Sequence, residues 1–402
     1  MAGSTVLFGL LALLIVAIVA GASYALHRSP RRRAMKAAAT NPSLDYASRS
    51  NWSQSKGKLN YSSFVFFDRD RDGCYGVGDA PMAGIMVRLA GERGLITSAR
   101  TNAAGFGNFP ISIAKRKAAI SSPGRYEFRV SVPPGWIATG DNAVQARDFL
   151  AIPGSPAGIG TEAMLQPVGL APERIVRLRL VSEAGWIAAH REGRQLDRAE
   201  ISHGSPFQYR VPDEAQSVTV SAGDVEWRLA PVGFPVDLGA IDPTRGTPHA
   251  DRATETIDFD GITSRGLRKI PSGYAGLNWF NLNAMARDYT PGSQGYINGN
   301  TSGAHIAYTS SGHPAELWSD TPFDFISVAL SGAWLKAEGE TATIESWRGD
   351  ELISRDRIVL SALAPVYYTP MLPDITRIRF STGHYWQMVI DDLTIARSKA
   401  QH

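Results

Sequence analysis

The chain has 402 residues, of which 44% are hydrophobic, and it contains 39 glycines. This length and composition allow two or three domains with their own cores and exclude a disordered protein. The net charge of +3 is small, and no basic cluster beyond the N-terminal region is interleaved with aromatic residues, so nucleic acid is not an expected partner. Cys74 is the only cysteine, which excludes an intrachain disulfide.

The N-terminal segment has the features of a membrane span. Residues 1–26 contain no charged side chain, and residues 5–26 are apolar and long enough to cross a bilayer. We predict one transmembrane helix in residues 1–27, which acts as an anchor; small residues around Ala20 and Ser23 leave a cleaved signal segment as the alternative. Residues 28–60 are basic and then Ser-rich, without hydrophobic periodicity, and are predicted to be a linker.

A run of aspartates after the aromatic residues 64–67 is the most informative motif. Twelve positions are spaced as in an oxygen-ligand loop for calcium, with carboxylates at positions one, three, five and twelve and glycine at the sharp turn of position six. Alternating apolar residues in 85–89 indicate that strands flank the loop, in place of the helices of an EF-hand. The predicted metal site consists of Asp68, Asp70, Asp72, Asp79 and the backbone carbonyl of Cys74, with Gly73 at the turn; an acidic solvated turn is the alternative.

Residues 61–168 continue with short alternating runs between Gly and Pro turns, which predict an antiparallel β-sandwich. With the aspartate loop, the Thr-x-x-x-Gly turn at 101–105 and the Pro-Pro-Gly turn at 133–135, this segment resembles the B-type modules of the serine-aspartate repeat family of bacterial surface adhesins. The resemblance implies a stalk or spacer that is stiffened by calcium and has no catalytic role. It covers about a quarter of the chain.

Two further β domains are predicted. Residues 171–242 repeat the alternating pattern without resembling a known family, and the aperiodic residues 241–254 mark a boundary. Residues 255–397 are predicted to form a jelly-roll sandwich. Segments 257–260, 274–281, 295–299, 321–325 and 391–395 resemble a β-sandwich module of secreted bacterial proteins, some of them PEP-sorted, and of fungal proteins. That module is similar in shape to carbohydrate-binding modules, which implies glycan binding by analogy.

Sugar recognition requires an exposed aromatic ring and planar amides or carboxylates. Two Gly-rich segments of the C-terminal domain supply these types in Tyr274, Asn278, Trp279, Asn281, Tyr296 and Asn298. For Trp279 the alternative is core packing, because the neighbouring residues Leu277 and Phe280 are of core type.

A second calcium site is also predicted in this domain. Asp391 shares strand parity with apolar residues and should point inward, where an unpaired carboxylate costs several kcal/mol. A calcium ion where the first and last strands meet would be held by Asp258, Asp260, Asp391 and Asp392. The alternatives are a salt bridge to an arginine and an edge aspartate that faces water.

No motif of nucleophilic, metalloprotease or nucleotide chemistry is present, so we predict that the chain is not an enzyme. A glycoside hydrolase stays open, because its two carboxylates meet only in space. The expected function is that of a membrane-anchored surface protein with a calcium-stiffened β stalk and a C-terminal module for a glycan or surface partner; the alternative is a purely structural envelope, adhesion or assembly protein. Basic residues after the membrane segment favour a cytoplasmic location, whereas the calcium loop favours the cell surface or periplasm, which we prefer.

Overall fold

The computed structural model describes residues 59–398 except 78, 103, 116, 264–265, 287–288 and 290–293. This part of the chain is all-β, as predicted, and its few helical elements are short. It holds no helix with the length and apolar character that a membrane span needs. The predicted transmembrane segment 1–27 and nearly all of the predicted linker 28–60 lie outside the described residues.

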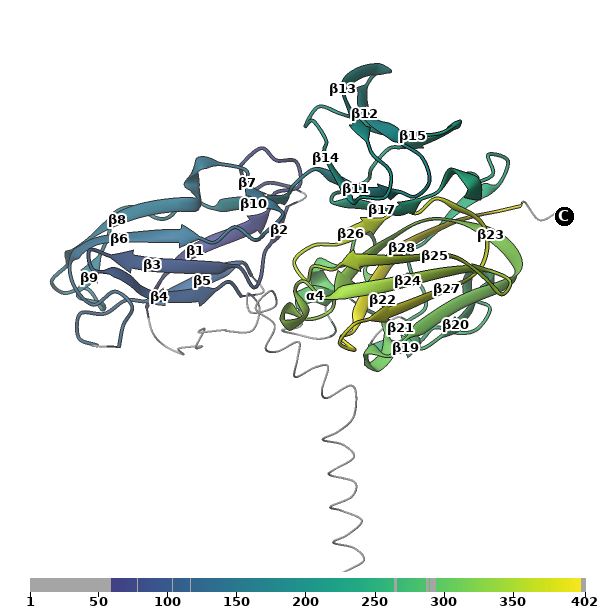
Figure 1. Cartoon of the computed structure of the whole chain (residues 1–402). Coiled ribbons are helices and arrows are strands. Elements are labelled where there is room, and N and C mark those ends of the chain that lie inside the picture. The colour runs from purple at the N-terminus through teal and green to yellow at the C-terminus, as the bar shows by residue number, and fades with distance from the viewer. Residues whose placement is uncertain are drawn as a thin grey trace, which may run out of the picture.

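The first module is a sandwich of two five-stranded sheets, at the left of Figure 1. One sheet has the order β2-β1-β10-β7 with β5 also paired to β1, and the other has the order β4-β3-β6-β8-β9. β1 and β10 run parallel, which departs from the predicted antiparallel arrangement, because the chain completes the second sheet before it returns beside β1. The elements are β1 (Asn60–Phe67), β2 (Ala80–Pro81), β3 (Met86–Gly91), β4 (Gly94–Arg100), β5 (Phe106–Pro110), β6 (Gly124–Val130), β7 (Trp136–Ala138), η2 (Asp141–Ala143), β8 (Val144–Ala151), β9 (Ile159–Gly160) and β10 (Val168–Pro172).

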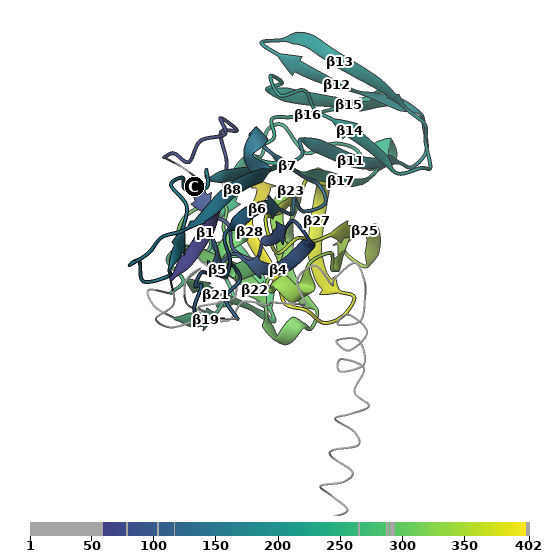
Figure 2. The same cartoon turned by 90° about the vertical axis from the view of Figure 1, so that its left-hand side faces the viewer.

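The middle module also has two sheets. The four-stranded sheet β13-β12-β15-β16 extends away from the rest of the molecule in Figure 2. The other sheet contains β14, β11 and β17, with β11 and β17 parallel. The elements are β11 (Ile175–Leu180), β12 (Gly185–Arg191), β13 (Arg194–Ile201), β14 (Phe207–Arg210), β15 (Ser217–Ala222), β16 (Val225–Leu229), β17 (Val236–Ile241) and η3 (Pro243–Arg245).

The third module is organised by its longest strand, β23 (Ala315–Gly332). The first part of β23 pairs with β27 and the second part with β28, so this strand passes from one group of strands to another. The first and last strands meet, since β18 pairs with β28. The other elements are β18 (Ala253–Ile257), β19 (Leu267–Lys269), η4 (Tyr274–Gly276), β20 (Asn278–Phe280), β21 (Leu282–Ala286), α4 (Gln294–Asn298), β22 (His305–Thr309), η5 (Ser310–Gly312), η6 (Leu335–Ala337), β24 (Thr341–Arg348), β25 (Glu351–Val359), β26 (Val366–Tyr368), β27 (Leu372–Thr382) and β28 (Met388–Arg397).

The three modules share sheets and cores. β17 of the middle module pairs in parallel with β26 of the third, which makes one sheet continuous across the two. Leu363 and Ala364, from the third module, are 2% and 3% exposed and belong to the hydrophobic core of the first. Gly84 lies so close to Leu335 that an added Cβ would stand 2.6 Å from its side chain. The modules are therefore packed against one another, which the sequence pattern did not predict.

Candidate functional site

The aspartate loop follows β1 and is held in shape by its own backbone. Asp68 is fully buried, and its two carboxylate oxygens accept hydrogen bonds from the amides of Arg71 at 2.7 Å and Gly73 at 2.8 Å. Asp79 closes the loop by accepting from the amides of Arg69 and Gly76, at 2.9 and 2.8 Å. Gly73 has a φ of 77°, the left-handed conformation expected at position six.

Three of the four predicted carboxylates converge. Asp68, Asp70 and Asp79 each place one oxygen within 4.8 Å of the others. Asp72 does not belong to this group, and one of its oxygens accepts from the amide of Cys74 at 2.7 Å. Within the described residues, none of these aspartates forms an ion pair with a cationic side chain.

The charges of the loop carboxylates are unevenly stabilised. Burial raises the pKa of Asp68, but hydrogen bonds, including those from the Gly73 and Arg71 amides, outweigh it and hold this pKa below its usual value. The pKa of Asp70 is raised: the amide of Asp72 lowers it, but desolvation and the neighbouring carboxylates Asp68, Asp72 and Asp79 act in the opposite direction. Crowded oxygens without a cationic partner match the ligand chemistry of calcium, so the residues present fit that ion.

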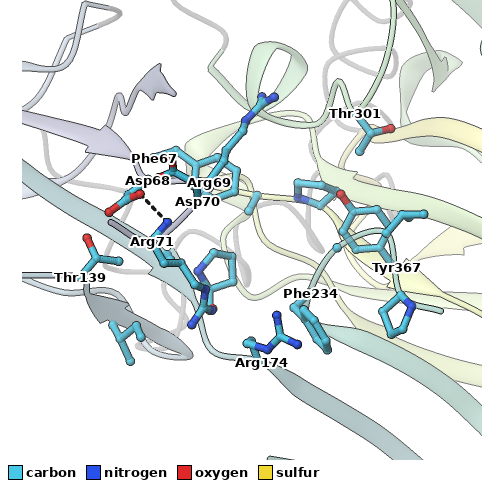
Figure 3. A pocket seen from close by; sticks show the side chains of 18 of the residues that line it. Phe67, Asp68, Arg69, Asp70, Arg71, Thr139, Arg174, Phe234, Thr301 and Tyr367 are labelled. Atoms are coloured by element: carbon cyan, nitrogen blue, oxygen red, sulfur yellow. Dashed lines mark hydrogen bonds between the residues drawn. The ribbon is translucent and has the colours of Figure 1, made fainter. Parts of the chain in front are cut away.

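The loop also reaches the middle module. The Arg71 guanidinium donates to the carbonyl oxygen of Pro172 and to Asp213, the latter at 3.2 Å. Arg174 lies 3.7 Å from the same Asp213 carboxylate. These side chains border a cleft of about 720 Å³ to which all three modules contribute (Figure 3).

The second predicted calcium site has a different arrangement. Asp391 is fully buried, as strand parity predicted, but it accepts hydrogen bonds from the amide and hydroxyl of Thr301 at 2.7 and 2.9 Å. Asp392 accepts from the hydroxyl of Ser302 at 2.6 Å, and its other oxygen lies 2.6 Å from the hydroxyl of Thr301, whose single proton the two aspartates share. Burial raises the pKa of Asp391 to about 7.

Asp260 contacts His305, a few residues after Thr301 and Ser302. It accepts a hydrogen bond from the His305 amide at 2.9 Å and lies 2.9 Å from the Nδ1 atom of the His305 ring. Asp258 accepts from the amide of Asp260 at 3.0 Å. These four aspartates form no three-ligand group among the described residues. Loop donors therefore contact these carboxylates, and the second calcium site stays a prediction.

Two of the three predicted sugar-binding rings are buried, and the third, Tyr274, is partly exposed. Trp279 is 5% exposed and donates its indole N–H to the carbonyl of Tyr274 at 2.9 Å, while Tyr296 is 2% exposed and donates to Gln387 at 2.5 Å. The prediction of ring stacking is wrong for both, because neither ring presents a face to solvent; core packing, the alternative for Trp279, is what the structure shows.

The amides of the same predicted set are also engaged. Asn281 donates to the carbonyls of Ser310, His313 and Pro314, and Asn298 donates to that of Ala362 at 2.8 Å. The carbonyl oxygen of Asn278 accepts from Ser272 at 2.5 Å. These contacts hold loops in place, and of the six residues only Asn298 borders the cleft between the modules.

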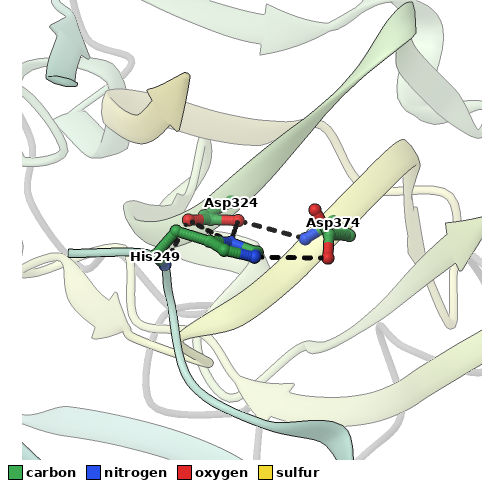
Figure 4. Close-up of side chains that lie close together, drawn as sticks. All are labelled: His249, Asp324 and Asp374. Atoms are coloured by element: carbon green, nitrogen blue, oxygen red, sulfur yellow. Dashed lines mark hydrogen bonds and ion pairs between the residues drawn. The ribbon is translucent and has the colours of Figure 1, made fainter. Parts of the chain in front are cut away.

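One group of side chains was missed from the sequence. His249, Asp324 and Asp374 come together at the start of the third module, with the His249 Nδ1 atom 3.1 Å from Asp324 and its Nε2 atom 3.7 Å from Asp374 (Figure 4). Arg252 bridges both carboxylates at 2.5 and 2.6 Å, so these aspartates already have a cationic partner. An aspartate between two phenylalanines, at 323–325, was the only signal in the sequence.

Comparisons with known proteins assign no family. No family model matches the chain, and no curated protein matches it. Among solved structures it is similar to TmCBM61 in complex with β-1,4-galactotriose (10% identity, 33% of this chain and 100% of that one, TM-score 0.20). It is also similar to a mutant of the major pilin from Streptococcus pyogenes (7% identity, 81% of this chain and 98% of that one, TM-score 0.20). A third similar structure contains the CBM22-1–GH10 modules of a Clostridium thermocellum xylanase (16% identity, 38% of this chain and 30% of that one, TM-score 0.19). TM-scores this low carry no argument about function, which has to come from the geometry.

Proposed function

We propose that this chain is an extracytoplasmic β-protein in which calcium stiffens the first module and its junction with the other two. The observation that carries the proposal is the convergence of Asp68, Asp70 and Asp79 without a cationic partner among the described residues. Calcium would bind to these hard oxygen donors and to the Cys74 carbonyl. Because Arg71 links the same loop to Asp213 of the middle module, an ordered loop would also restrict the position of that module.

The proposed location is the cell surface or periplasm, with residues 1–27 as the anchor. Extracellular modules bind calcium with dissociation constants of about 10⁻⁴–10⁻³ M. An exposed loop with an affinity in this range would be filled by extracellular calcium but not by the much lower cytosolic calcium. The basic residues after the anchor oppose this orientation, but flanking charge is a statistical bias and large domains can be exported against it. Protease accessibility in intact cells tests the topology: digestion from outside supports it, and protection until the cells are lysed refutes it.

The proposal includes no catalytic step. A hydrolase would need two carboxylates that face a bound substrate. In the Asp324–Asp374 pair, both carboxylates face Arg252. A purely structural role and a ligand-binding role differ in one respect: in the second, a ligand binds in the cleft between the modules.

The metal is tested by thermal unfolding of the full-length chain in detergent. Calcium at about 2 mM should raise the Tm and chelator should lower it, because an ion that binds only the folded state stabilises that state. Asp70→Asn with Asp79→Asn should abolish this difference, and Asp224→Asn, at an exposed turn, should retain it. A wild-type Tm that is the same with calcium and with chelator refutes the proposal.

A further inference from the structure

The cleft between the three modules has the size and composition of a binding site. Its volume of about 720 Å³ lies within the range of about 300–1,000 Å³ that is usual for small-molecule sites. Residues of the aspartate loop form one wall, residues near Phe234 another, and residues near Tyr367 and Thr301 a third (Figure 3).

Three arginines line this cleft, and their charges are incompletely balanced. Arg71 and Arg174 share one carboxylate, that of Asp213, whose side chain is 79% exposed and therefore well screened. Burial and the nearby Arg71 lower the pKa of Arg174, as expected where positive charge accumulates. Arg69 pairs with no carboxylate of the described residues, and its guanidinium lies 5.6 Å from the centre of the Phe67 ring.

Calcium would change the sign of this surface. The three arginines are matched by three aspartates of the lining, Asp68, Asp70 and Asp213, so the formal charges cancel. A divalent ion brings two positive charges, and its third carboxylate, Asp79, contributes one negative charge, so an excess of one positive charge remains around the cleft. An anionic ligand is then favoured, and more strongly with calcium than without it.

We propose that this cleft binds a short carboxylated saccharide, with Arg69 holding a carboxylate. An uncharged polar group favours a sugar over an acidic peptide: the Tyr367 hydroxyl, which borders the cleft, makes no hydrogen bond with the described residues. Apolar residues such as Val232, which is 89% exposed, offer surface to the C–H faces of a sugar ring. The site rests on the calcium loop of the proposed function, and neither Trp279 nor Tyr296 lines it.

The test is a binding titration of the full-length chain in detergent with three probes of matched length: trigalacturonate, maltotriose and triglutamate. Trigalacturonate should bind most tightly, and chelator or Asp70→Asn should weaken it. Arg69→Ala should weaken it by at least about tenfold, since it removes a charge-assisted contact. The matched control is Arg88→Ala, an exposed arginine on β3 outside the cleft, which should bind like the wild type.

Each alternative outcome overturns part of the proposal. Equal binding of maltotriose removes the role of charge, and equal or tighter binding of triglutamate removes the saccharide. Absence of trigalacturonate binding at millimolar concentration, or binding unchanged in Arg69→Ala, refutes the site. The calcium-dependent Tm is measured separately, so a stabilised protein that binds no trigalacturonate refutes this inference and leaves the proposed function standing.

Discussion

Truncation of Leu363 tests whether the third module completes the core of the first. Leu363 follows β25 in the third module, yet it is 2% exposed within the cluster that contains Val65, Phe128 and Leu170. Leu363→Ala should therefore destabilise a module to which the residue does not belong by sequence.

The expected loss follows from the atoms removed. Leucine to alanine deletes three carbon atoms, worth about 0.8 kcal/mol each when buried, and the remaining cavity adds to this loss. We expect a decrease of about 3 kcal/mol in the free energy of unfolding of the first module. This corresponds to an increase of about 100-fold in the exchange rate of amides that open only with the module.

Hydrogen exchange measured by mass spectrometry locates the effect. Peptides from β1 and β10 should exchange faster in Leu363→Ala, whereas those from β12 and β15 in the middle module should not. Leu352→Ala is the control, since Leu352 lies on β25 and is 41% exposed. Faster exchange confined to β25 and β26, with β1 and β10 unchanged, would show that the first module does not depend on this contact.

Three further predictions follow from charged contacts. Arg71→Ala should lower the free energy of unfolding by about 1–2 kcal/mol in denaturant titration and increase amide exchange in residues 68–76, because it removes the hydrogen bonds to Asp213 and Pro172. Arg252→Met should cost about 3–5 kcal/mol, because it leaves the fully buried Asp324 without its cation, and the double variant with Asp324→Asn should recover part of this loss. Burial raises the pKa of Glu338 from 4.5 to about 7, so the folded state holds the proton more tightly and the free energy of unfolding should fall by up to about 3 kcal/mol as the pH rises from 4.5 to 7. Glu338→Gln should lessen this pH dependence, and equal slopes in variant and wild type would contradict it.

Local patterns predicted the strands and the loop but not the pairing between modules. The alternation that placed strands in 85–89 and in 386–395 is a property of neighbouring residues, and β3 and β28 cover most of these positions. The parallel pair of β17 and β26 joins Val236 to Tyr367, far away in the chain, and leaves no local signature. The position of Leu363 also has no local signature, because a leucine in the sequence does not indicate which of several cores it will fill.

In the candidate sites, too, local features could be predicted from the sequence and contacts between distant residues could not. The spacing of Asp68, Asp70, Asp79 and Gly73 specifies a loop because the hydrogen bonds from loop amides to these aspartates connect residues at most ten positions apart. Whether Trp279 points outward depends on the pairing of β20 with β23, so residue type alone could not decide between a sugar platform and a core ring. Asp391 was correctly predicted to point inward, but its partner Thr301 is 90 residues away, so no local pattern indicated this hydrogen bond.

The calcium loop and the cleft share Asp68 and Asp70, and this sharing separates the two functions that calcium could serve. If calcium only stiffens the first module, its affinity is independent of any ligand in the cleft. If it also supplies the charge that attracts an anion, linkage requires reciprocity: whatever factor calcium adds to the affinity for trigalacturonate, trigalacturonate must add to the affinity for calcium. A factor of about ten in both directions is a coupling free energy of about 1.4 kcal/mol. A calcium affinity that saturating trigalacturonate leaves unchanged would confine the ion to stiffening, even in a protein that binds both.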